Sequence, residues 1–227
     1  HLVDRYEMTY EEWQGGRLEP FFAGPFYVRP PWVQASPSPD AVHELIIDPG
    51  VVFGAGTHPT TRDCLIALGK VSRDGGAHTA VDIGTGTGIL AVAAAKMGCR
   101  RVVAVDLNHL AVQTALANFR RNGLEAQVLP VQGLALDFIS LKADLVIANI
   151  HFDAMLPALR AFDPTHGRWL VLSGLLRSQV RQIEALLPGL CIEICDKWEH
   201  QETWFTLLAA VKHESRISRH KPEGATA

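Results

Sequence analysis

Long apolar runs are absent from this sequence: no stretch of eighteen hydrophobic residues occurs, although 48% of the 227 residues are hydrophobic. An α-helix needs about 20 apolar residues to cross a bilayer, so we expect no membrane span. The opening residues, HLVDRYEMTYEEW, are polar and acidic and lack the apolar centre of a signal peptide. We therefore expect a cytoplasmic protein whose apolar residues form the core of one large α/β domain.

Cysteine is scarce, and C-x-x-C spacing is missing. Cys64, Cys99, Cys191 and Cys195 each fall within an apolar stretch. We expect them to pack in a reducing environment, with Cys191 and Cys195 on one face of a strand. The histidines lack metal-ligand spacing, so we expect no metal site. The net charge of -3 lacks the basic excess typical of nucleic-acid-binding proteins, so direct binding of nucleic acid is not expected.

Segments with strand and helix periods alternate from about residue 60 onward. This alternation predicts a mostly parallel, doubly wound α/β sheet. Two late apolar segments, LCIEICDKW and TWFTLLAAV, are joined only by EHQE. They are predicted to pair antiparallel, with Trp198 and Trp204 packed around the hairpin. The earlier strands are predicted at TAVDIG (79–84), RVVAVD (101–106), AQVLPVQG, DLVIANI (144–150) and RWLVLSGL (168–175).

The two ends of the chain differ in composition from its middle. Residues 1–40 are rich in aromatic residues and proline, which favours one or two short strands and an extended crossing. We assign residues 1–45 to a linker or N-terminal extension. The polar residues 213–227 are predicted to be a disordered tail, which leaves residues 46–212 as the folded domain.

A glycine-rich turn follows the first strand of the alternating region. The segment VDIGTGTGIL contains Asp82 and then Gly84, Gly86 and Gly88. Glycine permits positive φ in a tight strand-to-helix turn and lets backbone approach a ligand. The pattern D-x-G-x-G-x-G does not fit the dinucleotide fingerprint G-x-G-x-x-G. Counted from Gly84, the fingerprint requires its third glycine at position 89, and that residue is Ile89. A plain glycine turn with a capping aspartate is the simpler alternative.

The next strand ends in Asp106, at the distance where an acidic residue meets a ribose diol. A carboxylate suits this task because it accepts hydrogen bonds from both hydroxyls. Together, VDIGTGTGILAVAAAKMG and VVAVD resemble motif I and the following acidic residue of class I S-adenosylmethionine-dependent methyltransferases. The resemblance implies a Rossmann-like sheet of seven strands with the last antiparallel. It also places Asp82 and the three glycines beside the cofactor and Asp106 on its ribose.

Two further segments narrow this resemblance. DPGVVFGAGTHPTT (48–61) resembles the signature of PrmA-type ribosomal protein lysine methyltransferases, and EEW…FYVRPPW and LSGLLRSQV extend the similarity over roughly residues 10–212. The resemblance implies S-adenosylmethionine as cofactor and a protein substrate, in that family a ribosomal protein. Family members usually carry a separate N-terminal recognition domain, and we expect this chain to start after it, either because the sequence is truncated or because it is a short homologue with another target. The cofactor contacts carried over from the family fall on Thr61, Gly84, Asp106 and Asn149, with Phe53 and Thr57 as further lining residues.

The strand end ANIHF (148–152) carries the predicted catalytic residue. Class I enzymes that act on nitrogen often have Asn or Asp at this strand end. By this resemblance, Asn149 would orient an amine lone pair towards the methyl group. The family commonly has NIL where this chain has NIHFD, which puts ribosomal-protein specificity in question. His151 can accept a proton there or make only local hydrogen bonds. Asp153 is predicted to be the N-cap of the next helix.

The segment FGAGTHPTT also has a purely structural interpretation. Thr60 and Asp63 fit a capping box that opens the following helix. His58 is then expected to fix the loop, while Gly54 and Gly56 let it fold over a ligand. Three other functions stay open at this point: a class I methyltransferase for a small molecule or RNA, a non-catalytic cofactor-binding module, and an NAD-dependent oxidoreductase.

Overall fold

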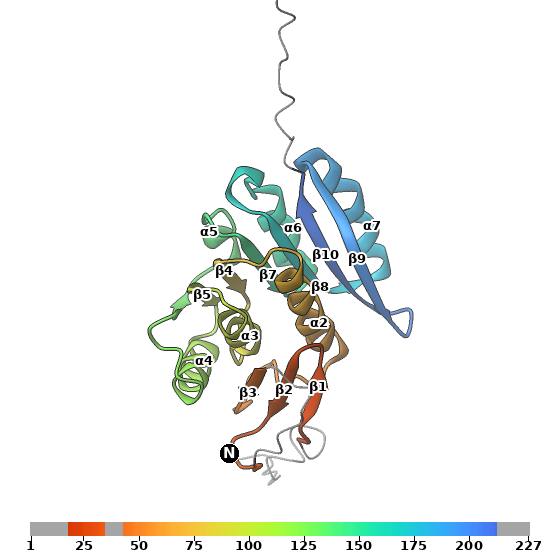
Figure 1. The fold of residues 1–227 in the computed structure, drawn as a ribbon. Coiled ribbons are helices and arrows are strands. Elements are labelled where there is room, and N and C mark those ends of the chain that lie inside the picture. Colours follow the sequence, from red (N-terminus) through yellow and green to blue (C-terminus); the bar gives the residue numbers. More distant parts are fainter. Residues whose placement is uncertain (1–17, 35–42, 213–227) are drawn as a thin grey trace, which may run out of the picture.

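The computed structural model describes residues 18–34 and 43–212. Its main layer is a seven-stranded sheet in the order β6-β5-β4-β7-β8-β10-β9 (Figure 1). The strands from β6 to β8 are parallel, whereas β10 pairs antiparallel with both β8 and β9. This confirms the predicted class of sheet and its closing antiparallel hairpin. The strands are β4 Thr79–Ile83, β5 Arg101–Asp106, β6 Val128–Gln132, β7 Leu145–Asn149, β8 Trp169–Leu176, β9 Ile192–His200 and β10 Trp204–Val211.

Helices cover both faces of this sheet (Figure 1), and an apolar cluster lies under each layer. In β8, Leu170 and Leu172 belong to one cluster and Val171 to the other, because successive side chains of a strand point to opposite faces. Burial on both sides explains why the central strands are continuous apolar runs. The helices are α2 Pro59–Arg73, α3 Ile89–Lys96, α4 His109–Arg121, α5 Ala135–Phe138, α6 Phe152–Arg160 and α7 Arg177–Leu186, with 3₁₀ turns at Pro164–His166 and Leu187–Leu190.

A small three-stranded sheet precedes the main one. Its strands are β1 Phe21–Ala23, β2 Phe26–Arg29 and β3 His43–Ile46, with β1 antiparallel and β3 parallel to β2. Figure 1 shows it beside α2, apart from the seven-stranded sheet. The prediction of one or two short strands before residue 40 is confirmed by β1 and β2, and the boundary proposed at residue 46 falls within β3. The predicted tail at 213–227 lies outside the described residues.

Two local predictions are wrong. Cys64 and Cys99 are buried as expected, but Cys191 and Cys195 are exposed. Cys191 precedes β9 with a φ of 55°, so it shares no strand face with Cys195. The edge strand β9 is covered on one side only, which leaves its alternate side chains in solvent.

The predicted capping box at the start of α2 is the second error. The N-cap lies two residues earlier than predicted: it is His58, and its ring accepts a hydrogen bond from the Thr60 N–H. Pro59 takes the first helical position, where its fixed φ suits the helix and its missing N–H costs nothing. Asp63 is therefore not needed as a cap, and its carboxylate lies 3.0 Å from Nε2 of His200.

The carboxyl group of Asp82 joins the end of β4 to the start of α3. One of its oxygens accepts hydrogen bonds from the Thr85 hydroxyl at 2.6 Å and from the Ala91 N–H at 3.1 Å. The N-cap of α3 is Gly88, which has no side chain, so Asp82 satisfies a free helix N–H in its place. Burial raises the pKa of Asp82 to about 7, against the effect of these two hydrogen bonds, and the charge of Asp106 adds to the increase.

We predict that this carboxyl makes stability fall between about pH 4 and pH 7. Its pKa is higher in the folded than in the unfolded chain, so the folded chain binds the proton more tightly and loses stability as the pH rises. Asp82→Asn keeps the size of the side chain and removes the titration. In urea unfolding at a series of pH values, the wild type should lose stability relative to Asp82→Asn across this range. Parallel curves for the two proteins would contradict the prediction.

Candidate functional site

A cavity of about 730 Å³ opens at the carboxyl ends of β4, β5 and β7. Its size lies within the usual range for small-molecule sites. Strand β4 pairs with β5 on one side and with β7 on the other. The chain first adds strands on the β5 side and then on the β7 side, so the strand order reverses at β4. Ligands of open α/β sheets bind at such a switch point. The walls come from parts of residues 51–60, the glycine turn after β4, the segments that follow β5, β6 and β7, Gly174 within β8, and Trp204 at the start of β10.

The glycine turn has positive φ at Gly84, Gly86 and Gly88, with values of 73°, 55° and 84°. A Cβ on Gly84 would lie 2.1 Å from a side-chain carbon of Ile150, and one on Gly86 would lie 2.3 Å from the Phe53 carbonyl oxygen. Both residues therefore need to be glycine because other parts of the chain pass close to them. The close approach brings the loop at Phe53 and the segment after β7 onto the turn.

Residues 53 and 54 are held directly on this turn. The N–H of Thr87 donates to the Phe53 carbonyl at 3.1 Å, and the Thr87 hydroxyl donates to the Gly54 carbonyl at 2.7 Å. Gly54 has a φ of 111°, and a Cβ there would lie 2.8 Å from the Thr87 hydroxyl oxygen. Phe53 is thus held at the wall of the cavity, because the carbonyls of residues 53 and 54 are bound to the glycine turn.

Asn118 of α4 links the glycine turn, at Thr87, to the segment that precedes the FGAG loop, at Asp48. This residue was not predicted. Its side-chain amide donates to the carbonyls of Thr87 at 2.9 Å and Asp48 at 2.8 Å, and its oxygen accepts from the Asp48 N–H at 2.9 Å. The side chain is fully buried. The signal in the sequence is its position, since Ala111, Ala115 and Asn118 follow helical spacing on the buried face of α4.

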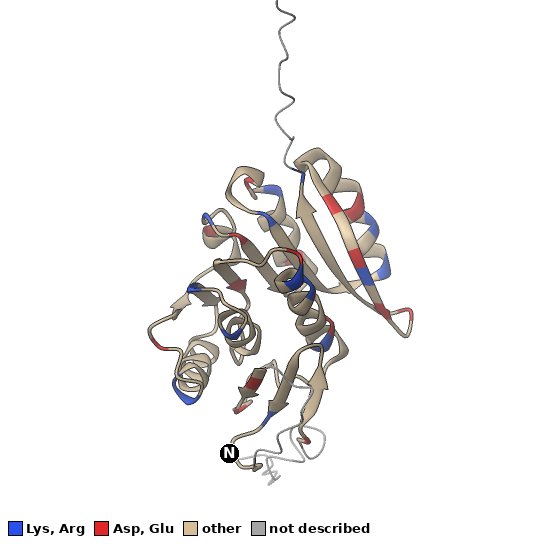
Figure 2. Cartoon of the chain, in the orientation of Figure 1, with Lys and Arg blue, Asp and Glu red and all other residues tan. Residues whose placement is uncertain are grey.

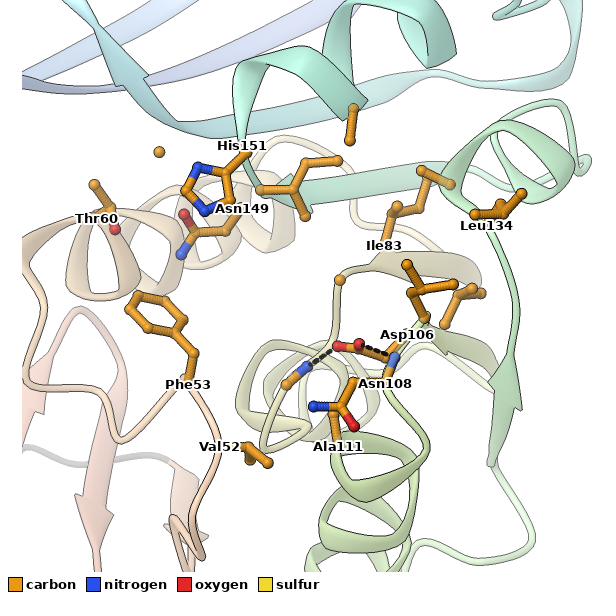
Figure 3. Close-up of a pocket in the computed structure, with 18 of the residues that line it drawn as sticks. Val52, Phe53, Thr60, Ile83, Asp106, Asn108, Ala111, Leu134, Asn149 and His151 are labelled. Atoms are coloured by element: carbon orange, nitrogen blue, oxygen red, sulfur yellow. Dashed lines mark hydrogen bonds between the residues drawn. The ribbon is translucent and has the colours of Figure 1, made fainter. Parts of the chain in front are cut away.

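Asp106, the last residue of β5, carries the anionic charge of the cavity. One carboxylate oxygen accepts from the Gly86 N–H and the other from the Asn108 N–H, both at 2.9 Å (Figure 3). Each oxygen keeps a further lone pair for a second donor. Figure 3 shows Ile83 and Leu134 on the same side of the cavity, so the carboxylate lies beside an apolar surface.

The opposite end of the cavity is polar and aromatic. Figure 3 shows the Asn149 amide and the His151 ring side by side, across from Phe53. The His58 ring packs edge-on against Trp204, with ring centres 5.0 Å apart, and lies 5.8 Å from Phe53. Burial lowers the pKa of His58, and the charge of His200 lowers it further. This end therefore offers an amide, two imidazoles and aromatic rings.

Some of the predicted site residues line this cavity and some do not. The predicted residues that line it are Phe53, Gly84, Gly86, Asp106 and Asn149. The predicted residues that do not line it are Thr57, Thr61, Asp82 and Gly88. Thr57 and Thr61 line a second hollow of about 330 Å³ along residues 51–58. The hydroxyl of Thr61 is buried there and has no hydrogen-bond partner among the residues that the structure describes.

Two further predictions near the cavity are wrong. Trp198 packs against the core, but Trp204 lines the cavity instead of packing with it around the hairpin. The N-cap of α6 is His151 and not Asp153, which lies in the first turn. Strand spacing shows which residues share a face but not which neighbouring loop they meet, so the role of Trp204 had no signal in the sequence.

Residues 18–34 and 43–212 contain neither a metal-binding cluster nor a membrane-spanning helix. No group of three or more His, Cys, Asp or Glu side chains there is arranged to hold a metal ion. No helix of these ranges is both long and apolar enough to cross a bilayer. Figure 2 shows Lys and Arg spread over several helices with acidic residues among them. The cavity is therefore the best candidate for a functional site in these residues.

Comparison with solved structures supports the fold around this cavity. The ribosomal protein L11 methylase of Lactobacillus delbrueckii subsp. bulgaricus superposes with a TM-score of 0.72 at 28% identity, covering 83% of this chain and 95% of that one. The O-methyltransferase TomG of Streptomyces achromogenes, solved in complex with SAM, gives a TM-score of 0.55 at 16% identity, over 69% of this chain and 82% of that one. The second likeness concerns the fold alone.

Comparison of sequences gives the family. A relative in Pelotomaculum thermopropionicum, a ribosomal protein L11 methyltransferase, is 39% identical over 192 residues, which are 82% of this chain and 59% of the relative. A protein of the same name in Alteromonas mediterranea is 42% identical over 176 residues, with coverages of 76% and 58%. The chain thus spans less than two thirds of these relatives. The family model for ribosomal protein L11 methyltransferase (PrmA) matches residues 5–212. The chain therefore belongs to the ribosomal protein L11 methyltransferase (PrmA) family.

Proposed function

We propose that this chain is an S-adenosylmethionine-dependent methyltransferase that methylates amine nitrogen on a protein. The observation that carries the proposal is the cavity with the Asp106 carboxylate at one end and the Asn149 amide at the other, joined by the glycine turn. Family membership supports the reaction class. The names of the relatives make ribosomal protein L11 the first substrate to test.

The residues present fit this cofactor. The free lone pairs of Asp106 suit the two hydroxyls of a ribose, and Ile83, Ala111 and Leu134 supply apolar surface for a purine ring. Gly84 and Gly86 line the cavity between its two ends, where the methionine part would lie. Asp82 and Gly88 enter the proposal as residues that hold the turn, and Thr57 and Thr61 stay predicted contacts.

The chain's own residues have to align the substrate amine and keep it neutral. The cofactor, when bound, supplies a methyl group on a positively charged sulfur, which is a good leaving group. A lysine amine has a pKa of about 10.4 in water, so it must lose a proton before it can react. The rings of Phe53 and Trp204 at this end can hold the amine by contact with their faces, which attract a cation, so the proton has to pass to an acceptor. The Asn149 oxygen can then accept an amine N–H and turn the lone pair towards the methyl group.

The exposure of Phe53 at the cavity favours a macromolecular substrate over a small enclosed one. Phe53 is 62% exposed although it lines the cavity, so the polar end is reached from the surface. A protein side chain can enter such an opening while the rest of its chain stays outside. A small-molecule methyltransferase would gain more from a closed lid, which excludes water from the whole substrate.

The proposal is tested by incubating the full chain with purified ribosomal protein L11 and radiolabelled S-adenosylmethionine. A lysate from cells lacking the enzyme serves as a second, unbiased source of acceptors. We expect label in L11, on lysine or another amine. Label confined to RNA or small molecules of the lysate would overturn the proposed substrate class, and no label in any acceptor would overturn the activity.

Asp106→Ala is expected to weaken S-adenosylmethionine binding by roughly 100-fold or more, because it removes two charge-assisted hydrogen bonds to the ribose. Titration calorimetry measures the affinity directly. Glu125→Ala is the matched control, since it removes an exposed carboxylate away from the cavity. Equal affinity of Asp106→Ala and wild type would exclude the ribose role.

Asn149→Ala is expected to lower turnover about 100-fold while cofactor affinity changes much less. The amide acts on the incoming nitrogen in our proposal, so its loss affects the aligned state more than the bound cofactor. Rates with the labelled substrate and calorimetry with S-adenosylmethionine separate the two effects. Turnover within twofold of the wild type would rule out the positioning role.

A further inference from the structure

Two histidines line the cavity, and their rings are held in different ways. Nδ1 of His58 accepts from the Thr60 N–H at 3.4 Å and lies 2.7 Å from the Thr60 hydroxyl. This arrangement puts the single ring proton on Nε2, so a second proton could go only to Nδ1. It would then break the cap of α2 and place a charge at a helix N-terminus, which is unfavourable. His58 is therefore a fixed structural ring.

His151 has no comparable structural task. It is the N-cap residue of α6, yet its side chain makes no capping hydrogen bond. Within the described part of the chain, no hydrogen bond or ion pair to its ring is found. The residue is exposed and also lines the cavity, so one ring faces both the site and solvent. Figure 3 shows it next to Asn149, at the end opposite Asp106.

We propose that His151 accepts the proton that the substrate amine must lose; this rests on the function proposed above. The ammonium gives one proton to a free ring nitrogen of His151, and the lone pair left behind forms the new N–C bond. As that bond forms, the C–S bond breaks and its electron pair stays on sulfur. The ring, being exposed, then releases the proton to water. Asn149 orients the amine while His151 deprotonates it.

Among the titratable side chains of the described residues that line the cavity, His151 is the one placed to act as the base. The other titratable side chains that line the cavity are His58, engaged with Thr60, and Asp106, at the far end (Figure 3). Asp153 lies in the first turn of α6 but does not line the cavity. Imidazole is also the side chain that exchanges protons near neutral pH, as a base for a lysine amine requires.

His151→Asn is the sharpest test, because asparagine is a good helix N-cap but cannot act as a proton acceptor near neutral pH. We expect turnover at pH 7 to fall about 100-fold, with S-adenosylmethionine affinity by calorimetry unchanged within twofold. The lost rate should return as the pH is raised towards 10, where solvent deprotonates the amine. Added imidazole should restore part of it at pH 7. His78→Asn, an exposed histidine at the other end of β4, is the matched control.

A second measurement does not depend on turnover. With ring-labelled histidine, adding the acceptor protein without cofactor should shift the NMR signal of His151 and leave that of His78 unchanged. An unshifted His151 signal, or a His151→Asn enzyme with the wild-type pH profile, would overturn the inference. These outcomes are distinct from failure of the proposed function, in which the wild type itself labels no amine. Equal thermal unfolding of both variants and wild type shows that folding is not the cause.

Discussion

The turn from β4 into α3 is the constraint on which the rest of the site depends. Three glycines with positive φ reverse the chain within five residues, and the peptide groups so exposed need partners from elsewhere. They find them in other elements: the Asp82 carboxylate caps α3, Asp106 binds the Gly86 N–H, and the Asn118 amide binds the Thr87 carbonyl. The turn is thus rigid through long-range polar contacts.

The same turn brings the walls of the cavity together. Thr87 binds the FGAG loop, which lies N-terminal to the main sheet in the sequence. The missing side chain at Gly84 leaves room for Ile150, in the segment after β7. Asp106 and Asn149 are the last residues of β5 and β7, which flank β4. They therefore lie on either side of the turn, although they are 43 positions apart in the sequence. The sheet order therefore produces one cavity with two chemically different ends, a carboxylate end and an amide–imidazole end.

This division fits the methyl transfer to nitrogen that we propose. In that proposal, the part of the cofactor that only has to be held would meet a carboxylate and apolar surface, whereas the reacting nitrogen would meet groups that orient it or accept its proton. The two histidines illustrate how context sets a role. Nδ1 of His58 is occupied by the first turn of α2, whereas the ring of His151, at the start of α6, has no hydrogen bond to any residue in 18–34 or 43–212.

Sequence patterns were enough to predict the alternation of strands and helices, the glycine turn, the strand-end positions of Asp106 and Asn149, and the antiparallel closing hairpin. These follow from local periodicity and from short segments whose backbone demands are specific. Only the tertiary structure decided that His58 caps α2, that Asn118 joins two loops, that Trp204 lines the cavity, and that Thr57 and Thr61 line a different hollow. The physical reason is that periodicity fixes which face a side chain occupies, whereas its partner depends on which distant segment packs there.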